Sequence, residues 1–218
     1  MRRLTQLRTY EVALHGAGLG PVAGIDEAGR GACFGPVTIA ACILPHGRVA
    51  ALEGLTDSKR LTPRRREQLY DVIRDVAVAY SVVHIPAAQI DRRGIQNANL
   101  DGARRAVASL SERPGYVLVD AFRVPGLSVP QLPIIGGDNT VRCIAAASVL
   151  AKVNRDRLVT QMAAEFPGYG LEGHKGYGTS AHMDAVRRHG ASREHRYSYA
   201  NVRSAHTEFK NSRGHNEC

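Results

Sequence analysis

The sequence predicts an α/β domain built on a mixed β-sheet, and three observations lead to this class. Two apolar runs, 22–26 and 36–44, flank a glycine-rich turn in the pattern of a β-hairpin. Helical and strand-like segments then alternate along the chain, which is typical of α/β proteins. The chain has 218 residues, 44% of them hydrophobic, so one domain with an ordinary core is expected.

The segment after the hairpin carries the signals of a helix. Thr62 is a suitable N-cap, and Pro63 suits the first helical position. Apolar residues follow at helical spacing: Leu69, Val72, Ile73 and Val76. The later predicted elements are a strand over 79–85, a helix over 97–110, strands over 116–119 and within 132–138, a long alanine-rich helix from about residue 140, and a helix over 179–189.

Three parts of the chain are expected from these elements. An N-terminal extension covers 1–19, and the main domain covers 20–203, with a C-terminal helical region over about 140–203. The polar segment over 204–218 is expected to be a disordered tail, because it offers little apolar surface to bury.

The charge balance indicates a polyanionic partner. Lysine and arginine number 29 against 20 acidic residues, which gives a net charge of +9. The alternative is that the excess charge serves solubility alone. Tryptophan is absent and aromatic residues make up 6%, which argues against a broad base-stacking platform.

Composition also indicates the compartment. The four cysteines show no zinc-ligand spacing and no disulfide pattern, so they are expected to be core thiols apart from the terminal Cys218. No apolar stretch reaches the roughly 18 residues of a membrane helix, and the N-terminus lacks the apolar core of a secretion signal. A cytoplasmic protein without membrane contact is expected.

Acidic residues follow three of the predicted strands. They are Asp26 and Glu27, then Asp120, then Asp138. In open α/β sheets, ligands bind at the ends of strands near a crossover. Converging carboxylates repel one another unless a cation neutralises them, and oxygen ligands without cysteine or histidine suit Mg²⁺ or Mn²⁺. Two such ions about 4 Å apart are a known arrangement for cleaving phosphodiesters.

Each acid also has a structural interpretation. Asp26 and Glu27 could begin a turn, although an inward-facing Asp26 is costly without a partner. Asp120 could be an ordinary residue after a strand. Asp138 could cap the helix that begins near Thr140, with or without a role in metal binding.

Five motifs in order resemble the ribonuclease HII family over roughly residues 20–200. They are GIDEAGRG (24–31), TDSKRL (56–61), VLVDAF (117–122), GDNTVRCIAAASVLAKVNRD (137–156) and GHKGYGT (173–179). The resemblance implies a ribonuclease H-like fold, with a five-stranded mixed sheet flanked by helices and a C-terminal helical region. It implies an endonuclease for RNA–DNA hybrids and for duplex DNA with embedded ribonucleotides. Such an enzyme cuts on the 5′ side of a ribonucleotide and leaves 3′-hydroxyl and 5′-phosphate ends.

The resemblance also assigns roles. The four acids, Asp26, Glu27, Asp120 and Asp138, match the catalytic metal ligands. The turn Gly29, Arg30 and Gly31 matches the backbone sensor of the ribose 2′-hydroxyl, a group that donates and accepts hydrogen bonds. Tyr177 matches the tyrosine that packs against the neighbouring sugar and base; the alternative is a core aromatic.

Four further residues are expected to assist substrate binding. Ser58 and Lys59 would support the acids or the nucleic-acid backbone, and His174 and Lys175 would contact phosphate, against the alternative of a solvated loop. Two glycines depart from the usual family pattern: Gly136, where lysine is common, and Gly178, where proline is common. Asp156 is interpreted as a structural ion-pair former.

Two other functions fit part of this pattern. Ribonuclease HIII shares the core acids but usually has a sizeable N-terminal extension, and here residues 1–19 precede the first strand. A non-catalytic hybrid-binding protein would not need a set of acids that repels phosphate. The expected protein is therefore a monomeric ribonuclease H of type II.

Overall fold

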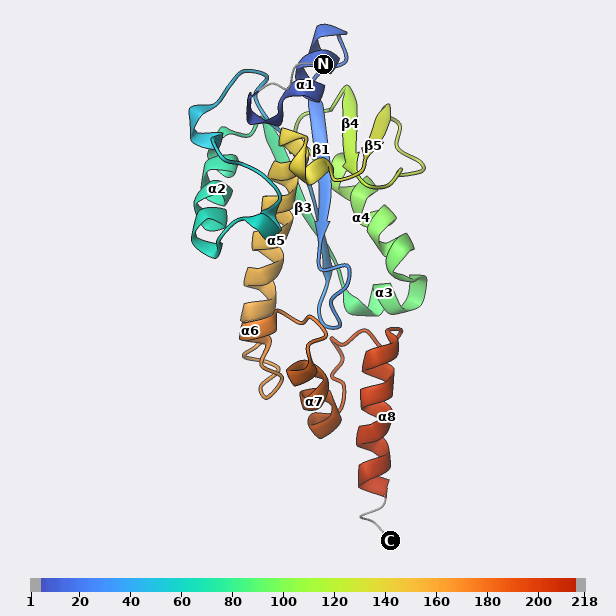
Figure 1. Cartoon of the computed structure of the whole chain (residues 1–218). Helices are drawn as coiled ribbons and strands as arrows, with labels where there is room; N and C mark the ends of the chain where they lie inside the picture. Colours follow the sequence, from blue (N-terminus) through green and yellow to red (C-terminus); the bar gives the residue numbers. More distant parts are fainter. Residues whose placement is uncertain (1–4, 215–218) are drawn as a thin grey trace. The chain divides into compact units, whose positions relative to one another are not determined.

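A single mixed sheet of five strands organises the fold, in the order β3-β2-β1-β4-β5 (Figure 1). The computed structural model describes residues 5–214. β1 pairs antiparallel with β2 and parallel with β4, and β4 pairs parallel with β5. The predicted hairpin and the mixed sheet are therefore confirmed. The strands are β1 (Val22–Ala28), β2 (Val37–Ile43), β3 (Ala79–Ile85), β4 (Tyr116–Asp120) and β5 (Gln131–Ile134).

The helices account for most of the remaining chain. They are α1 (Thr9–Gly16), α2 (Pro63–Val76), α3 (Ala87–Arg93), α4 (Ile95–Ala108), α5 (Arg142–Met162), α6 (Leu171–His174), α7 (Ser180–His189) and α8 (Ala200–Gly214), with short 3-10 turns η1 (Thr5–Leu7), η2 (Ala50–Leu52), η3 (Ser58–Arg60) and η4 (Gly137–Asn139). The predicted cap of α2 is confirmed, because the Thr62 side chain accepts a hydrogen bond from the Arg65 N–H. No helix within residues 5–214 is long and apolar enough to span a bilayer.

The prediction of a disordered tail is wrong for residues 204–214. These residues continue α8, which begins at Ala200. Val202 and Ala205 are buried one helical turn apart, so one side of the helix packs into a core despite the polar composition. Residues 215–218 lie outside the described part of the chain.

The chain divides into two compact units. The first unit comprises Met1–Ala28, Thr38–Val83 and Leu100–Asn154, and the second comprises Gly29–Val37, His84–Asn99 and Arg155–Cys218. The sequence had indicated one main domain over 20–203. Each unit has a hydrophobic core of its own.

The core of the first unit places α5 directly against the sheet. A side chain at Gly24 on β1 would approach the Cys143 backbone carbon to 2.2 Å, so glycine is needed for this contact. The first half of α5 is alanine-rich and is buried without interruption from Val141 to Ala151. These small residues, with α2, form one core on this face of the sheet. The close packing brings the start of α5 next to the strand that carries Asp26.

The core of the second unit is built around aromatic residues. Phe34, Val159 and Phe166 pack with residues of α7 and α8, which lie side by side (Figure 1). Two arginines, Arg155 and Arg196, have no exposed surface in this unit. A buried arginine is costly unless its donors are satisfied, so their partners define the loops around them.

Candidate active site

Asp26 and Asp120 lie on two neighbouring parallel strands in the first unit, Asp120 at the end of β4 and Asp26 two residues before the end of β1. The last pair in the β1–β4 ladder is Ile25 with Val119, and each acid is the next residue on its strand. Side chains alternate along a strand, so both acids lie on the same face as Gly24 and Leu118. Asp26 is only 5% exposed. Two of the predicted metal ligands are thus brought together on the face covered by α5.

Burial raises the pKa of the Asp26 carboxyl well above its ordinary value. The charges of Glu27 and Asp120 raise this pKa further, while a hydrogen bond from Ser148 opposes the shift. The Glu27 N–H also donates to Asp26 Oδ1 at 2.7 Å. The Ser148 hydroxyl oxygen also lies 2.9 Å from that of Ser58, so Ser58 contacts the residue that holds Asp26, and its supporting role stays a prediction.

Asp138 lies in η4, immediately before α5. The Gly137 N–H donates to Asp120 Oδ1 at 2.8 Å, which links the η4 turn to the end of β4. Burial raises the pKa of Asp138, and the charges of Asp120 and Asp57 add to this effect. Asp138 Oδ1 accepts a hydrogen bond from the Asn139 side chain, and α5 begins only at Arg142. The third acid therefore belongs to the same electrostatic group.

The backbone conformation explains why glycine occupies position 136. Gly136 has a left-handed backbone, with φ of 64° and ψ of 35°. This conformation favours glycine over lysine, the residue that the resemblance led us to expect here.

Lys59 supplies a positive charge to the group of acids. Its Nζ lies 3.8 Å from Asp138 Oδ2, although its side chain is 74% exposed. Burial lowers the pKa of Lys59, but the carboxylates of Asp57, Asp26, Asp138 and Asp120 outweigh it and raise the pKa overall. Lys59 therefore stays cationic beside the acids.

The loop that carries Ser58 and Lys59 is fixed by local hydrogen bonds. The Asp57 side chain accepts from the Lys59 N–H at 2.9 Å. Arg66 donates to the Ser58 and Leu61 carbonyls at 2.8 and 3.0 Å. One arginine of the basic run at 64–66 thus orders this loop.

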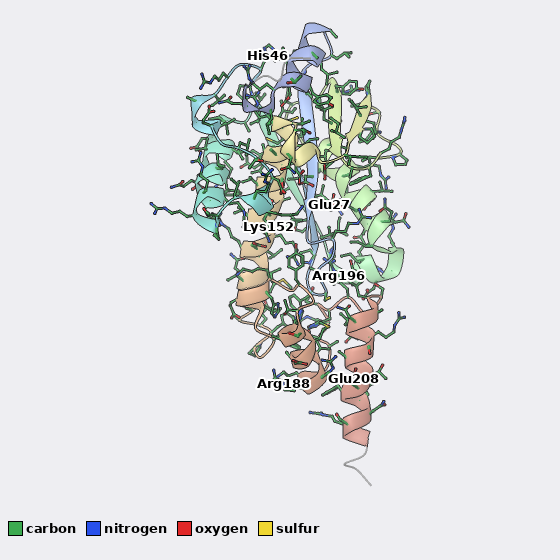
Figure 2. All side chains as sticks on the ribbon, viewed as in Figure 1. Glu27, His46, Lys152, Arg188, Arg196 and Glu208 are labelled. Atoms are coloured by element: carbon green, nitrogen blue, oxygen red, sulfur yellow. The ribbon has the colours of Figure 1, made fainter. Side chains whose placement is uncertain are left out.

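Glu27 is coupled to Asp26 by charge although it lies on the other face of the strand: after burial, the charge of Glu27 is the largest cause of the raised Asp26 pKa. Strand alternation directs residue 27 to the face of β1 opposite to Asp26, and Glu27 is half-buried there. Figure 2 labels Glu27 on β1 and Lys152 on the part of α5 in the same unit. Within residues 5–214, no three acidic, histidine or cysteine side chains are arranged to hold one metal ion. The four acids thus form one electrostatic group, and within residues 5–214 no metal site is preformed in it.

The chemistry of the donors nevertheless fits a hard divalent cation. The electrostatic group offers carboxylate oxygens without sulfur or imidazole, as Mg²⁺ and Mn²⁺ prefer. Burial is the main cause of the raised pKa values of Asp26 and Asp138, and the neighbouring carboxylates add to it; a bound cation would stabilise the charged form of both. Mg²⁺ is usually held by one or two carboxylates together with substrate phosphates, so a complete protein cage is not required.

The predicted sensor turn lies in the second unit. Gly29 has φ of 84°, and a side chain there would approach Arg155 Nε to 1.8 Å, so the protein itself requires this glycine. At Gly31, a Cβ would meet no atom within 4 Å, and φ is not in the left-handed range. The Arg30 carbonyl accepts hydrogen bonds from Arg196 Nη1 and the Tyr199 hydroxyl. Both lone pairs of that carbonyl are therefore used internally.

Tyr177 is joined to the sensor turn within the second unit. It forms an antiparallel bridge with Ala32, one residue after the turn. The Gly176 carbonyl accepts from the N–H groups of Cys33 and Phe34. The Arg155 guanidinium carbon lies 5.2 Å from the centroid of the half-buried Tyr177 ring. The turn and the tyrosine loop are thus one hydrogen-bonded structure.

The other predicted loop residues make contacts within the protein. His174 Nε2 pairs with the Tyr169 carbonyl at 2.8 Å, and His174 Nδ1 accepts from the Gly176 N–H at 3.2 Å. Lys175 Nζ donates to Thr160 Oγ1 and the Glu172 carbonyl. A side chain at Gly178 would approach Asn201 Nδ2 to 2.7 Å, which explains glycine at this position. These contacts favour a structural role for His174, and phosphate contact by Lys175 stays a prediction.

Several residues near these sites were not predicted from the sequence. Arg155 donates to the carbonyls of Pro36, Lys175 and Phe34, and Arg196 donates to those of Gly35 and Arg30. Charged residues in polar stretches, as both arginines are, look like surface residues in a sequence. Ser148 was not predicted either, but the sequence does contain a hint of its role, because it is a polar residue within an otherwise apolar stretch.

A mixed sheet in this strand order, with carboxylates at the ends of adjacent parallel strands, defines a ribonuclease H-like hydrolase. Among solved structures, the ribonuclease H2 of Pyrococcus horikoshii has a TM-score of 0.74 and 25% identity, over 87% of this chain and 98% of that chain. A ribonuclease HIII structure described as a complex with Mn²⁺ shares the fold, with a TM-score of 0.67, 18% identity and coverage of 92% and 74%.

The chain belongs to the ribonuclease HII family. The family profile described as Ribonuclease HII matches residues 23–202. A protein named Ribonuclease HII from Corynebacterium efficiens is 67% identical over 209 residues, covering 96% of this chain and 90% of its own. One from Mycolicibacterium smegmatis is 60% identical over 205 residues, covering 94% and 75%. The family consists of endonucleases for the RNA of RNA–DNA hybrids, so the expected type II ribonuclease H is confirmed.

Proposed function

We propose that this ribonuclease H also nicks duplex DNA on the 5′ side of an embedded ribonucleotide, leaving 3′-hydroxyl and 5′-phosphate ends. Asp26, Glu27, Asp120 and Asp138 would hold Mg²⁺ or Mn²⁺ at the scissile phosphate. The observation that carries this proposal is the shared face of Asp26 and Asp120, with the pKa of Asp26 raised by burial, Glu27 and Asp120.

The bound cations would supply charge stabilisation and an activated water for hydrolysis. The residues of this chain have supporting roles. Ser148 and the Glu27 N–H hold the Asp26 carboxylate, and the Gly137 N–H holds that of Asp120. Lys59 places a positive charge beside Asp138, where it also suits a phosphate of the substrate.

Recognition of the ribose would use the backbone around Gly31. Since no packing contact or backbone angle demands glycine there, the bare backbone serves close approach by a ligand. The Arg30 carbonyl is already bonded to Arg196 and Tyr199, so it is a poor acceptor for the 2′-hydroxyl. The remaining N–H and C=O groups of the turn would read that hydroxyl, with Tyr177 against the neighbouring sugar and base.

Three broader expectations belong to the same proposal. Residues 20–203 would act together as one catalytic domain on hybrids and on ribonucleotide-containing duplex DNA. The enzyme would work as a monomer. Cys33, Cys42 and Cys143 are free thiols, which suits a reducing compartment such as the cytoplasm.

A mapped nicking assay tests this function. A duplex DNA with one ribonucleotide would be incubated with the protein and Mg²⁺, Mn²⁺ or EDTA, beside an all-DNA duplex of the same sequence. The expected result is one nick 5′ of the ribonucleotide with either metal, and none in EDTA or in the all-DNA duplex. Cleavage 3′ of the ribonucleotide, or nicking that persists in EDTA, would contradict the proposal.

A further inference from the structure

Two histidines of the second unit, His182 and His195, form a hydrogen-bonded chain that ends at the Tyr177 loop, and a third, His174, stacks on His182. His182 Nδ1 lies 2.9 Å from the Tyr177 carbonyl oxygen, and His182 Nε2 lies 3.1 Å from His195 Nε2. His195 Nδ1 accepts a hydrogen bond from the Ser192 N–H at 3.0 Å. The His174 ring stacks on His182, with centroids 4.4 Å apart. The chain thus runs from a backbone amide to the carbonyl of the substrate-contacting tyrosine.

These contacts fix the proton positions. The Tyr177 carbonyl can only accept, so the hydrogen-bonded chain that ends there leaves His195 Nδ1 unprotonated and puts the proton of a neutral His195 on Nε2. His195 Nδ1 then accepts from the Ser192 N–H and from the Ser192 hydroxyl, whose oxygen lies 2.8 Å away. That proton points at His182 Nε2, which is therefore unprotonated and accepts the hydrogen bond. His182 then carries its proton on Nδ1, facing the Tyr177 carbonyl, which accepts it. When both histidines are neutral, every contact pairs a donor with an acceptor. An added proton on either ring would place two N–H donors opposite each other.

The surroundings keep the chain neutral. His182 and His195 are fully buried, and burial lowers the pKa of His182 to about 4 and that of His195 to about 3. The other titratable or charged side chains around them are His174 on α6, Tyr169 before it, His206 on α8 and Arg196, next to His195 in the chain. Glu194 precedes His195 in the chain, but no acid is among the causes that shift the pKa of His182 or His195.

We propose that His182, oriented by His195, is a positioning residue for Tyr177 in the recognition of the ribonucleotide. His182 acts by holding the Tyr177 carbonyl, and His174 holds the Gly176 N–H on the other side. The two contacts fix the backbone on both sides of the peptide that joins Gly176 to Tyr177. This inference rests on the proposed contact between Tyr177 and the substrate.

The first test measures the protonation of the two buried histidines and does not depend on enzyme activity. Nitrogen-15 NMR of the histidine rings would report tautomers and titration in the full-length protein. We expect His182 protonated on Nδ1 and His195 on Nε2, with neither ring titrating between about pH 5.5 and 8. A reversed tautomer in either ring, or titration near the ordinary histidine pKa, would overturn the proposal.

The second test compares two substitutions of His182. In His182→Asn, the amide nitrogen takes the place of Nδ1 and can still donate to Tyr177, whereas His182→Leu has no donor. In His182→Leu we expect the hydrogen exchange of the Tyr177 and Thr179 amides to become about tenfold faster. We also expect KM for the one-ribonucleotide duplex to rise about tenfold, with little change in kcat. His182→Asn should restore most of both losses. His189→Asn, an exposed histidine on the same helix, is the control and should match the wild type.

The outcomes separate this inference from the proposed function. Equal losses in the Asn and Leu variants, or unchanged amide exchange in the Leu variant, would overturn the positioning role. A rise in KM without a rise in exchange would overturn it as well. If exchange and tautomers behave as expected but the wild type does not nick the duplex, the role of His182 in ordering the loop is supported and the proposed function fails.

Discussion

Asp26 and Asp120 are neighbours on adjacent parallel strands, one residue beyond the paired Ile25 and Val119. The pairing register and the alternation of side chains place both carboxylates on the face covered by α5. Their mutual repulsion contributes to the raised pKa of Asp26, although burial is the larger cause. Without a bound cation, the burial and the repulsion of these two carboxylates lower the stability of the folded protein. Their arrangement therefore suits metal binding and not stability.

Asp26→Asn should therefore stabilise the metal-free protein while it removes activity. The amide is neutral and can still accept a hydrogen bond from Glu27 or Ser148. We expect a gain of about 1–3 kcal/mol in the free energy of unfolding at neutral pH in EDTA. Nicking should fall by more than about a hundredfold. Chemical denaturation and the nicking assay measure the two effects, and a destabilised Asp26→Asn protein would contradict this account.

The two glycines of the sensor turn should respond differently to alanine. Gly29→Ala introduces a side chain at φ of 84° against Arg155, so a loss of about 2–4 kcal/mol in unfolding free energy is expected. Gly31→Ala should change that free energy by less than about 0.5 kcal/mol, yet weaken nicking at a single ribonucleotide. Thermal denaturation of both variants, with nicking rates for Gly31→Ala, makes the comparison. Wild-type nicking by Gly31→Ala would remove Gly31 from the recognition of the ribose.

Arg155 should be essential to the loops of the second unit. Its guanidinium donates to three carbonyls, and a lysine in its place has one ammonium that cannot span them. Arg155→Lys is expected to lower the free energy of unfolding by about 2–4 kcal/mol. Arg157→Lys, two residues along the same helix and exposed, is the matched control and should have no measurable effect. Equal stability of the two variants would show that the buried hydrogen bonds contribute little.

The buried histidines predict a loss of stability in acid. The folded-state pKa values of His182 and His195 are lowered to about 4 and about 3, below the ordinary histidine pKa of 6.5. Below pH 6.5 the unfolded chain binds protons that the folded protein excludes, so stability should decrease as pH falls toward about 4. Denaturation of wild type and His195→Asn across this range measures the effect. A pH dependence in His195→Asn as steep as in the wild type would contradict it.

The sequence was sufficient for the sheet, because alternating apolar runs predicted the strands. The metal-ligand role of the four acids stays a prediction, although the register brings Asp26 and Asp120 together and the Gly137 N–H links the turn of Asp138 to Asp120. Glu27 illustrates the limit of this reasoning, because adjacency in sequence means opposite faces on a strand. The helix at 200–214 was missed because two buried residues, Val202 and Ala205, anchor an otherwise polar segment.

The roles of the buried polar residues could not be predicted in the same way. Arg155, Arg196, His182 and His195 are polar residues in polar stretches, and only tertiary contacts bury them. Their hydrogen bonds reach across long sequence separations, such as the 166 residues between Arg196 and Arg30. Local patterns carry no information about such partners. The division of the glycine turn into a structural Gly29 and an open Gly31 likewise depends on tertiary packing.

The central claim is that the carboxylates at the strand ends form the metal-dependent catalytic site. Cleavage of a one-ribonucleotide duplex by Asp120→Asn, with Asp101→Asn as a control in the same unit, tests it most directly. Asp101 lies on α4, where it pairs with Arg104. We predict that Asp120→Asn folds normally and loses metal-dependent nicking, while Asp101→Asn retains it. Wild-type nicking by a folded Asp120→Asn protein would contradict the account.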